Sequence, residues 1–112
     1  MLGEEHPNTL TSMSQLAGTL KAQGDLASAR KLGDQVLEIR RRVFGEQHPD
    51  TLASIHNLAF TLHAMGERSA AMALMNRAVV GSAAALGAQH PDTANSASAL
   101  AAWRAAAPPA TR

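Results

Sequence analysis

The sequence predicts an all-α protein that is built from repeated pairs of helices. The chain has 112 residues, of which 46% are apolar but only 3% are aromatic. Ala and Leu supply most of the apolar content and favour helices, whereas β-branched and aromatic residues are too sparse to suggest strands. A motif with a His-Pro pair also recurs every 42 residues, which indicates that one structural unit is repeated along the chain.

The repeat is visible in three copies of the motif. They read LGEEHPNTL, FGEQHPDTL and LGAQHPDTA, beginning at residues 2, 44 and 86. The first two units, over about 3–44 and 45–86, share 15 identical residues out of 42. A partial third unit covers about 87–107. We therefore expect one repeat domain over 1–107 and a flexible tail over 108–112.

Two helices are expected in the first unit, over about 7–23 and 26–43. Each segment carries apolar side chains at helical spacing. Gly24 and Asp25 separate them, since both residues favour turns. The first stripe consists of Leu10, Met13, Leu16, Ala17 and Leu20, and the second of Leu26, Ala29, Leu32, Val36, Ile39 and Val43.

The second unit repeats this pattern, and the third contributes one more helix. A first-type helix with Leu52, Ile55, Leu58, Ala59 and Leu62 is followed by a break at Gly66 and Glu67. A second-type helix follows, with Ala71, Leu74, Ala78 and Val79 as its stripe. The fifth helix is expected over about 92–106, before Pro108 and Pro109, which cannot continue it.

The recurring histidines, at positions 6, 48 and 90, raise the question of a metal site. Equivalent residues of successive helix pairs lie at least one helix-packing distance apart, roughly 8–10 Å, which is too far for a shared ion. Pro is favoured at the first position of a helix, and Asp next to it complements the helix dipole. We therefore interpret the motif as a helix start, with the His side chain hydrogen-bonding either an unpaired N–H of the helix or the neighbouring turn, and with the preceding Gly ending the previous helix.

The pattern Leu58-Ala59-x-x-Leu62, followed by Gly66 and Ala71, resembles the tetratricopeptide repeat. The 42-residue period and the HPDT sequence are similar to the kinesin-light-chain subtype, which also occurs in bacterial signalling proteins. This resemblance implies a right-handed α-solenoid of about two and a half repeats. It further implies that the first helix of each pair lines a concave groove, which binds a peptide or a helix of a partner protein.

The same resemblance places the candidate partner-binding residues on the first helices, just beside the apolar stripes. These residues are Gln15, Lys21, His56, Asn57, Phe60 and His63. The amide of Asn57 could hold a peptide backbone, because it donates and accepts at once. For Phe60 two interpretations stay open, an anchor for a ligand side chain or packing against the neighbouring helix. The third unit offers Asn95 and Ser98 but has Ala99 in place of the amide.

Other function classes have little support. The motifs GxSxG, HExxH, GxGxxG and the P-loop are missing, so we expect neither an enzyme nor a cofactor. The net charge of +1 does not indicate nucleic acid or a membrane surface as a partner. The residues Arg40, Arg41 and Arg42 are expected to be a solvated helix end or, alternatively, a contact for an acidic partner or a nucleic acid, for which one triplet without interleaved aromatic residues is weak evidence. No run of about 18 apolar residues and no signal peptide is present, so a cytoplasmic location is expected.

The second hypothesis for the function is a regulatory or oligomerisation segment of a larger signalling ATPase or transcription regulator. The terminal helices would expose surfaces that are meant for a neighbouring repeat. Met13 and Trp103 are therefore expected to be partly exposed, and such surfaces favour a homo-oligomer.

Overall fold

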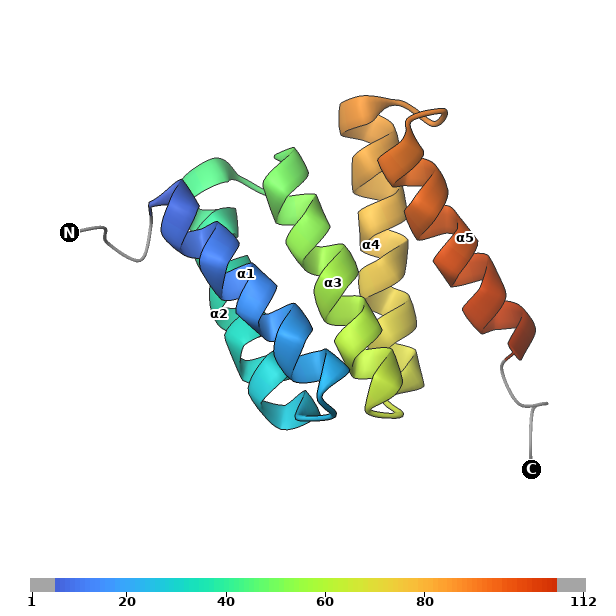
Figure 1. Cartoon of the computed structure of the whole chain (residues 1–112). Helices are drawn as coiled ribbons and strands as arrows, with labels where there is room; N and C mark the ends of the chain where they lie inside the picture. The colour runs from blue at the N-terminus through green and yellow to red at the C-terminus, as the bar shows by residue number, and fades with distance from the viewer. Residues whose placement is uncertain (1–5, 107–112) are drawn as a thin grey trace.

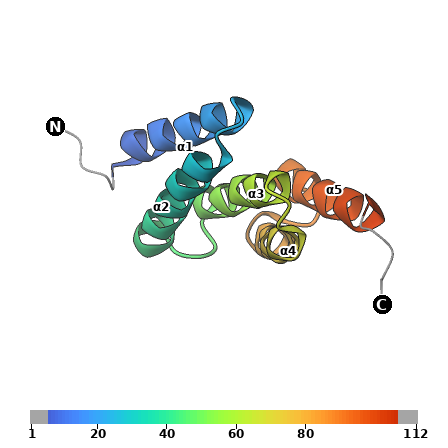
Figure 2. The ribbon, with the colours of Figure 1, turned by 90° about the horizontal axis from the view of Figure 1, so that it is seen from below.

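The computed structural model describes residues 6–106, which form five helices in a row (Figure 1). Their bounds are α1 Pro7–Ala22, α2 Leu26–Phe44, α3 Pro49–Ala64, α4 Arg68–Leu86 and α5 Pro91–Ala106. Each helix packs mainly on its neighbours in the sequence, and α1 also touches α3. In Figure 2, α1, α3 and α5 lie along one side and α2 and α4 along the other. The predicted all-α solenoid of helix pairs is confirmed, and the expected tail lies outside the described residues.

The helix ends follow from the repeated motif. In the second copy, the His48 Nδ1 atom accepts a hydrogen bond from the Asp50 backbone N–H at 3.0 Å, and α3 begins at Pro49. The first and third copies form the same bond, at 3.1 Å in each. Gly45 and Gly87 end the preceding helices with φ angles of 92° and 104°, which only glycine adopts without strain. The motif is therefore a helix boundary, and its histidines cap helices.

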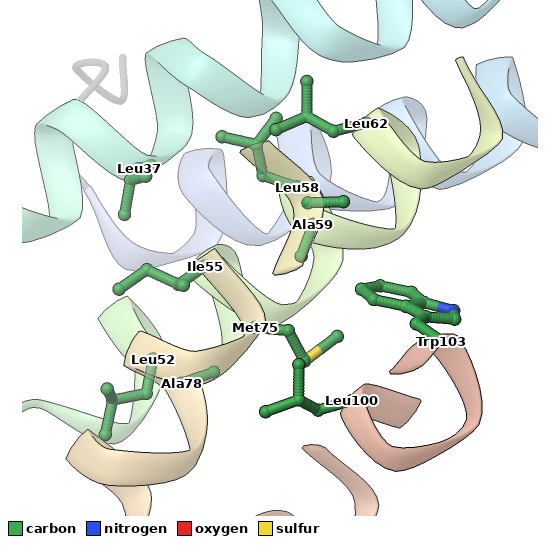
Figure 3. Packing of buried hydrophobic residues seen from close by; sticks show 11 residues of the cluster. Leu37, Leu52, Ile55, Leu58, Ala59, Leu62, Met75, Ala78, Leu100 and Trp103 are labelled. Atoms are coloured by element: carbon green, nitrogen blue, oxygen red, sulfur yellow. The ribbon is translucent and has the colours of Figure 1, made fainter. Parts of the chain in front are cut away.

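The main core lies between α2, α3, α4 and α5 (Figure 3). Its buried members are Leu37, Leu52, Ile55, Leu58, Ala59, Leu62, Ala71, Met75, Ala78, Leu100 and Trp103. A smaller cluster of Leu10, Val36 and Ile39 joins α1 to α2. The stripe predicted for α1 is thus only partly buried, and Leu16 keeps 52% of its surface exposed. Its repeat equivalent Leu58 is 5% exposed, because α3 has a preceding helix to pack against and α1 has none among the described residues.

Among the described residues, α4 is the one helix that is long and apolar enough to cross a membrane by length and composition. Core helices of soluble proteins satisfy the same criteria, so this is weak evidence for a membrane span. Here α4 packs against α3 and α5, and it carries Asn76 and Arg77 in its middle.

Candidate functional site

A hollow of the described surface lies between α1, α2 and α3 and has a volume of about 390 Å³. We call it the main groove. Its floor is formed by small or apolar residues of α2, namely Ala29, Gly33 and Val36. Its walls come from α1 and α3, and they consist of Ser14, Ala17, Gly18, Lys21, Ser54, His56, Asn57, Leu58, Phe60 and Thr61. The groove therefore combines an apolar floor with walls that mix apolar and polar side chains.

The width of the groove depends on a difference between the two repeats. Gly18 of α1 is the equivalent of Phe60 of α3, 42 residues later. A Cβ atom added at Gly18 would meet no other heavy atom within 4 Å. The glycine thus leaves open the space in which the second repeat carries a large ring.

Among the described residues that line the main groove, Lys21 is the one that is formally charged. Its Nζ atom lies 5.5 Å from the centre of the Phe60 ring, within the range of a cation–π contact. This contact links the α1 wall to the α3 wall. The groove is therefore positively charged at this end, beside an aromatic surface.

Asn57 and His56 lie where the main groove meets a second hollow. Asn57 is exposed, so its amide is available to a ligand. His56 is half-buried, and its Nδ1 atom shares a hydrogen bond with the Ser96 hydroxyl at 2.8 Å. Burial lowers the pKa of the His56 imidazole from its ordinary value of 6.5, and the nearby Asp92 carboxylate partly opposes this shift. His56 is thus mainly neutral near pH 7 and can accept at Nδ1.

The structure brings together four of the six predicted residues, and it places Gln15 and His63 elsewhere. Lys21, His56, Asn57 and Phe60 line the main groove. Gln15 is exposed on α1 but does not line it. The His63 ring stacks on Trp103, with 4.3 Å between centroids and 6° between planes, and its Nε2 atom is buried without a hydrogen-bond partner.

The prediction that Trp103 is partly exposed is wrong, because only 7% of its surface is exposed and the side chain is buried. It reaches back from α5 onto α3, where it packs against His63 and, edge to face at 5.1 Å, against Phe60. Figure 3 shows its ring beside the core of α3 and α4. Phe60 packs on the neighbouring helix, as one of the two interpretations predicts. It also lines the groove, so its ring is placed where the other interpretation, an anchor for a ligand side chain, requires it.

The arginine triplet is only in part the solvated helix end that the sequence predicts, because Arg42 is exposed while Arg40 is buried. Arg40 is 7% exposed, and its Nη1 atom donates to the Ser54 hydroxyl at 2.8 Å. Burial lowers the pKa of its guanidinium, and the Asp50 carboxylate opposes this effect. Arg41 pairs with Glu46 at 3.3 Å, an interaction that the spacing alone could not show.

Sequence reasoning missed the residues that α2 contributes to the groove and the role of Trp103. Gly33 and Val36 lie on a second-type helix, so a search restricted to first helices passes over them. A signal was present in Gly33, because a glycine inside a helix indicates a close approach. A Cβ atom there would lie 3.3 Å from Leu58.

Comparisons with known proteins agree with this geometry. A family model described as tetratricopeptide repeat matches residues 9–80. The chain is similar to a Podosopora anserina protein described as a kinesin light chain with nearly identical TPR-like repeats, and to a single-residue variant of it. Both share 34% identity over 92% of this chain, with TM-scores of 0.85 and 0.84. This chain spans 49% of the length of each of those solved chains. No curated protein matches it.

Proposed function

Because this chain belongs to the tetratricopeptide repeat family, a class of protein–protein interaction modules, we propose that its main groove binds an extended peptide or a helix of a partner protein. The observation that supports this proposal most is the groove itself, which has an apolar floor, walls of mixed apolar and polar side chains, and a volume of about 390 Å³. Grooves of this composition, with a few convergent polar groups, are the usual form of binding sites.

The lining suggests how such a segment would be held. The Asn57 amide can donate to and accept from a peptide backbone. The space beside Gly18 and Phe60 would accept one apolar side chain, and the Lys21 ammonium would attract a carboxylate near it. All these groups lie on helices that are fixed by the core, so the ligand would bear most of the ordering cost.

The proposal is tested by peptide selection against the intact chain, followed by affinity measurement for the selected peptides. We expect Asn57→Ala and Gly18→Phe to weaken binding by about tenfold or more, the loss of ~1.4 kcal/mol or more. The first change removes the amide, and the second puts into the groove the ring that the second repeat has at that position. Circular dichroism would show unchanged helicity in both variants.

A matched pair of lysines serves as the control. Lys21 lines the groove, whereas Lys31 is exposed on α2 and does not line it. Lys21→Ala should therefore reduce affinity for peptides with a carboxylate, and Lys31→Ala should leave it unchanged. Selected peptides that bind all these variants equally well would show that the main groove is not the site.

A further inference from the structure

The two junctions between successive helix pairs differ at one buried position. At the first junction, between α2 and α3, α2 carries Arg40. At the second junction, between α4 and α5, the equivalent residue 42 positions later is Ser82. The residues opposite them are the same in both junctions, because Asp50 and Ser54 of α3 correspond to Asp92 and Ser96 of α5.

The first junction holds a guanidinium group of the chain itself. The Arg40 Nη1 atom donates to the Ser54 hydroxyl at 2.8 Å and to the Asp50 carbonyl oxygen at 3.4 Å. Ser54 in turn donates to the same carbonyl oxygen at 3.2 Å. These acceptors are thus arranged to receive a planar cation at the start of α3.

The second junction has the equivalent acceptors but no arginine from α4. Ser82 and Ser96 are each 3% exposed, and a hollow of about 120 Å³ lies beside them. We call it the Ser82 hollow. Its lining includes Asp92, Asn95 and Ser96 of α5. One water molecule needs roughly 10–15 Å³ of such volume, so the hollow has room for a group of several heavy atoms.

The charges and hydrogen bonds around the Ser82 hollow favour a cation. Within the part of the chain that the structure describes, Asp92 is the one formally charged residue that lines it. The Ser96 hydroxyl shares its hydrogen bond with His56 Nδ1 at 2.8 Å. When the neutral ring carries its proton on Nε2, Ser96 donates in this bond, so its lone pairs remain able to accept from a ligand.

From this internal template, we infer that the Ser82 hollow is a binding site for the guanidinium group of an arginine side chain from a partner protein. The guanidinium donates to the Ser96 hydroxyl and the Asp92 carbonyl oxygen, as Arg40 does to their equivalents. His56 and Asn57 line both this hollow and the main groove. A partner segment in the groove therefore reaches the hollow with one arginine, and in this respect the inference rests on the proposed function.

The test uses the intact chain and a blocked arginine, N-acetyl-arginine methylamide, as the probe. Titration is followed by NMR, through the side-chain amide of Asn95, the backbone amide of Ser96 and the ring protons of His56. We expect saturable shifts at these three residues. The citrulline analogue, which has the same shape without the charge, should bind about tenfold more weakly, because hydrogen bonds from charged donors are stronger.

Two variants locate the site. Ser82→Arg fills the hollow with the side chain that the first junction has, so we expect it to abolish the shifts. Asp92→Asn removes the single charge of the hollow and introduces the residue that the first unit has at the equivalent position, Asn8. It should weaken binding of the probe severalfold. If Ser82→Arg does not fold, as judged by circular dichroism, Asp92→Asn decides the question.

Three outcomes would overturn the inference: no saturable shift up to the solubility limit of the probe, unchanged binding in the folded variants, or binding of free arginine but not of the blocked form. The last outcome would assign the hollow to a free amino acid. Because no partner peptide is used, failure of this titration is distinguishable from failure of the peptide selection that tests the main groove.

Discussion

At the scale of single residues, the chemistry of His56 depends strongly on its surroundings. It is half-buried, it contacts the Phe60 ring at 4.9 Å between centroids, and it bonds to Ser96. Burial lowers its pKa in the folded chain below the ordinary value of 6.5, and Asp92 only partly opposes this. The folded chain thus binds a proton at this residue less tightly than the unfolded chain does.

We therefore predict that His56 makes the protein less stable in acid. Its contribution to the free energy of unfolding is fully present above pH 6.5 and falls as the pH drops through and below this value. Thermal unfolding between pH 5 and pH 8 measures this dependence. In His56→Gln, which can still bond to Ser96 but does not titrate, the melting temperature should fall less between pH 7 and pH 5. Equal slopes in the two proteins would contradict the prediction.

The sequence predicted the residues of the groove better than their contacts. Apolar periodicity located Leu58 in the core, but it also placed its equivalent Leu16 there, which is exposed. The difference arises because burial depends on whether another helix covers the stripe. For the same reason, the pattern could not show that Trp103 reaches back to His63, since this contact joins residues of different repeats.

At the scale of helices, α3 and α4 approach closely at Gly81. A Cβ atom added there would lie 2.5 Å from Leu52 Cδ2, closer than real Cβ atoms approach other atoms, so Leu52 would have to move. Leu52 is 4% exposed and belongs to the main core. Gly81 thus keeps the second helix pair tightly packed, although glycine is a poor helix former.

This close approach predicts different effects for the same substitution at two helical glycines. Gly18→Ala should raise the free energy of unfolding by about 0.5–1 kcal/mol, because alanine favours the helix and the added Cβ meets nothing within 4 Å. The free energy of unfolding of Gly81→Ala should be at least ~1 kcal/mol lower than that of Gly18→Ala, since overpacking a core costs roughly 1–3 kcal/mol. Urea denaturation of the two variants and the unchanged protein checks this. Equal gains in both would show that α3 and α4 are not tightly packed at Gly81.

The helices themselves were predictable from the sequence to within a few residues. The second helix was expected to end at residue 43 and ends at Phe44, and the breaks at Gly24 and Gly66 are where the structure turns. Glycine, proline and the capping histidine act locally, so their effect can be derived without the rest of the fold. The hollow at Ser82 could not be predicted, because it depends on the space that three helices leave between them.

At the scale of the whole molecule, stability is unevenly distributed along the row of helices. The main core joins α2 to α5, whereas α1 is held by the small cluster around Leu10, Val36 and Ile39. In such one-dimensional arrays each unit contacts only its neighbours, so its stability depends on its own packing and on those contacts. The repeat equivalents Leu20 and Leu62 reflect this, since Leu20 is half-buried and Leu62 is 4% exposed.

We predict that backbone amides in α1 exchange with deuterium faster than those at the equivalent positions of α3. Local opening of α1 breaks fewer buried contacts, so its free energy is lower than that of α3. Hydrogen exchange followed by mass spectrometry would compare residues 10–22 with residues 52–64. Equal protection of the two segments would indicate that all five helices open as one cooperative unit.

The difference between Arg40 and Ser82, which occupy equivalent positions of successive repeats, can also be used in protein engineering. In a junction with arginine, the chain's own guanidinium group occupies the acceptors. In a junction with serine, a hollow remains that the arginine of a partner can enter. In a designed array of this 42-residue unit, the choice of residue at this one position would set which junctions accept an arginine. The positions of the serine junctions in the array could then be matched to the spacing of arginines in a target peptide. The helices that carry the groove would not have to change.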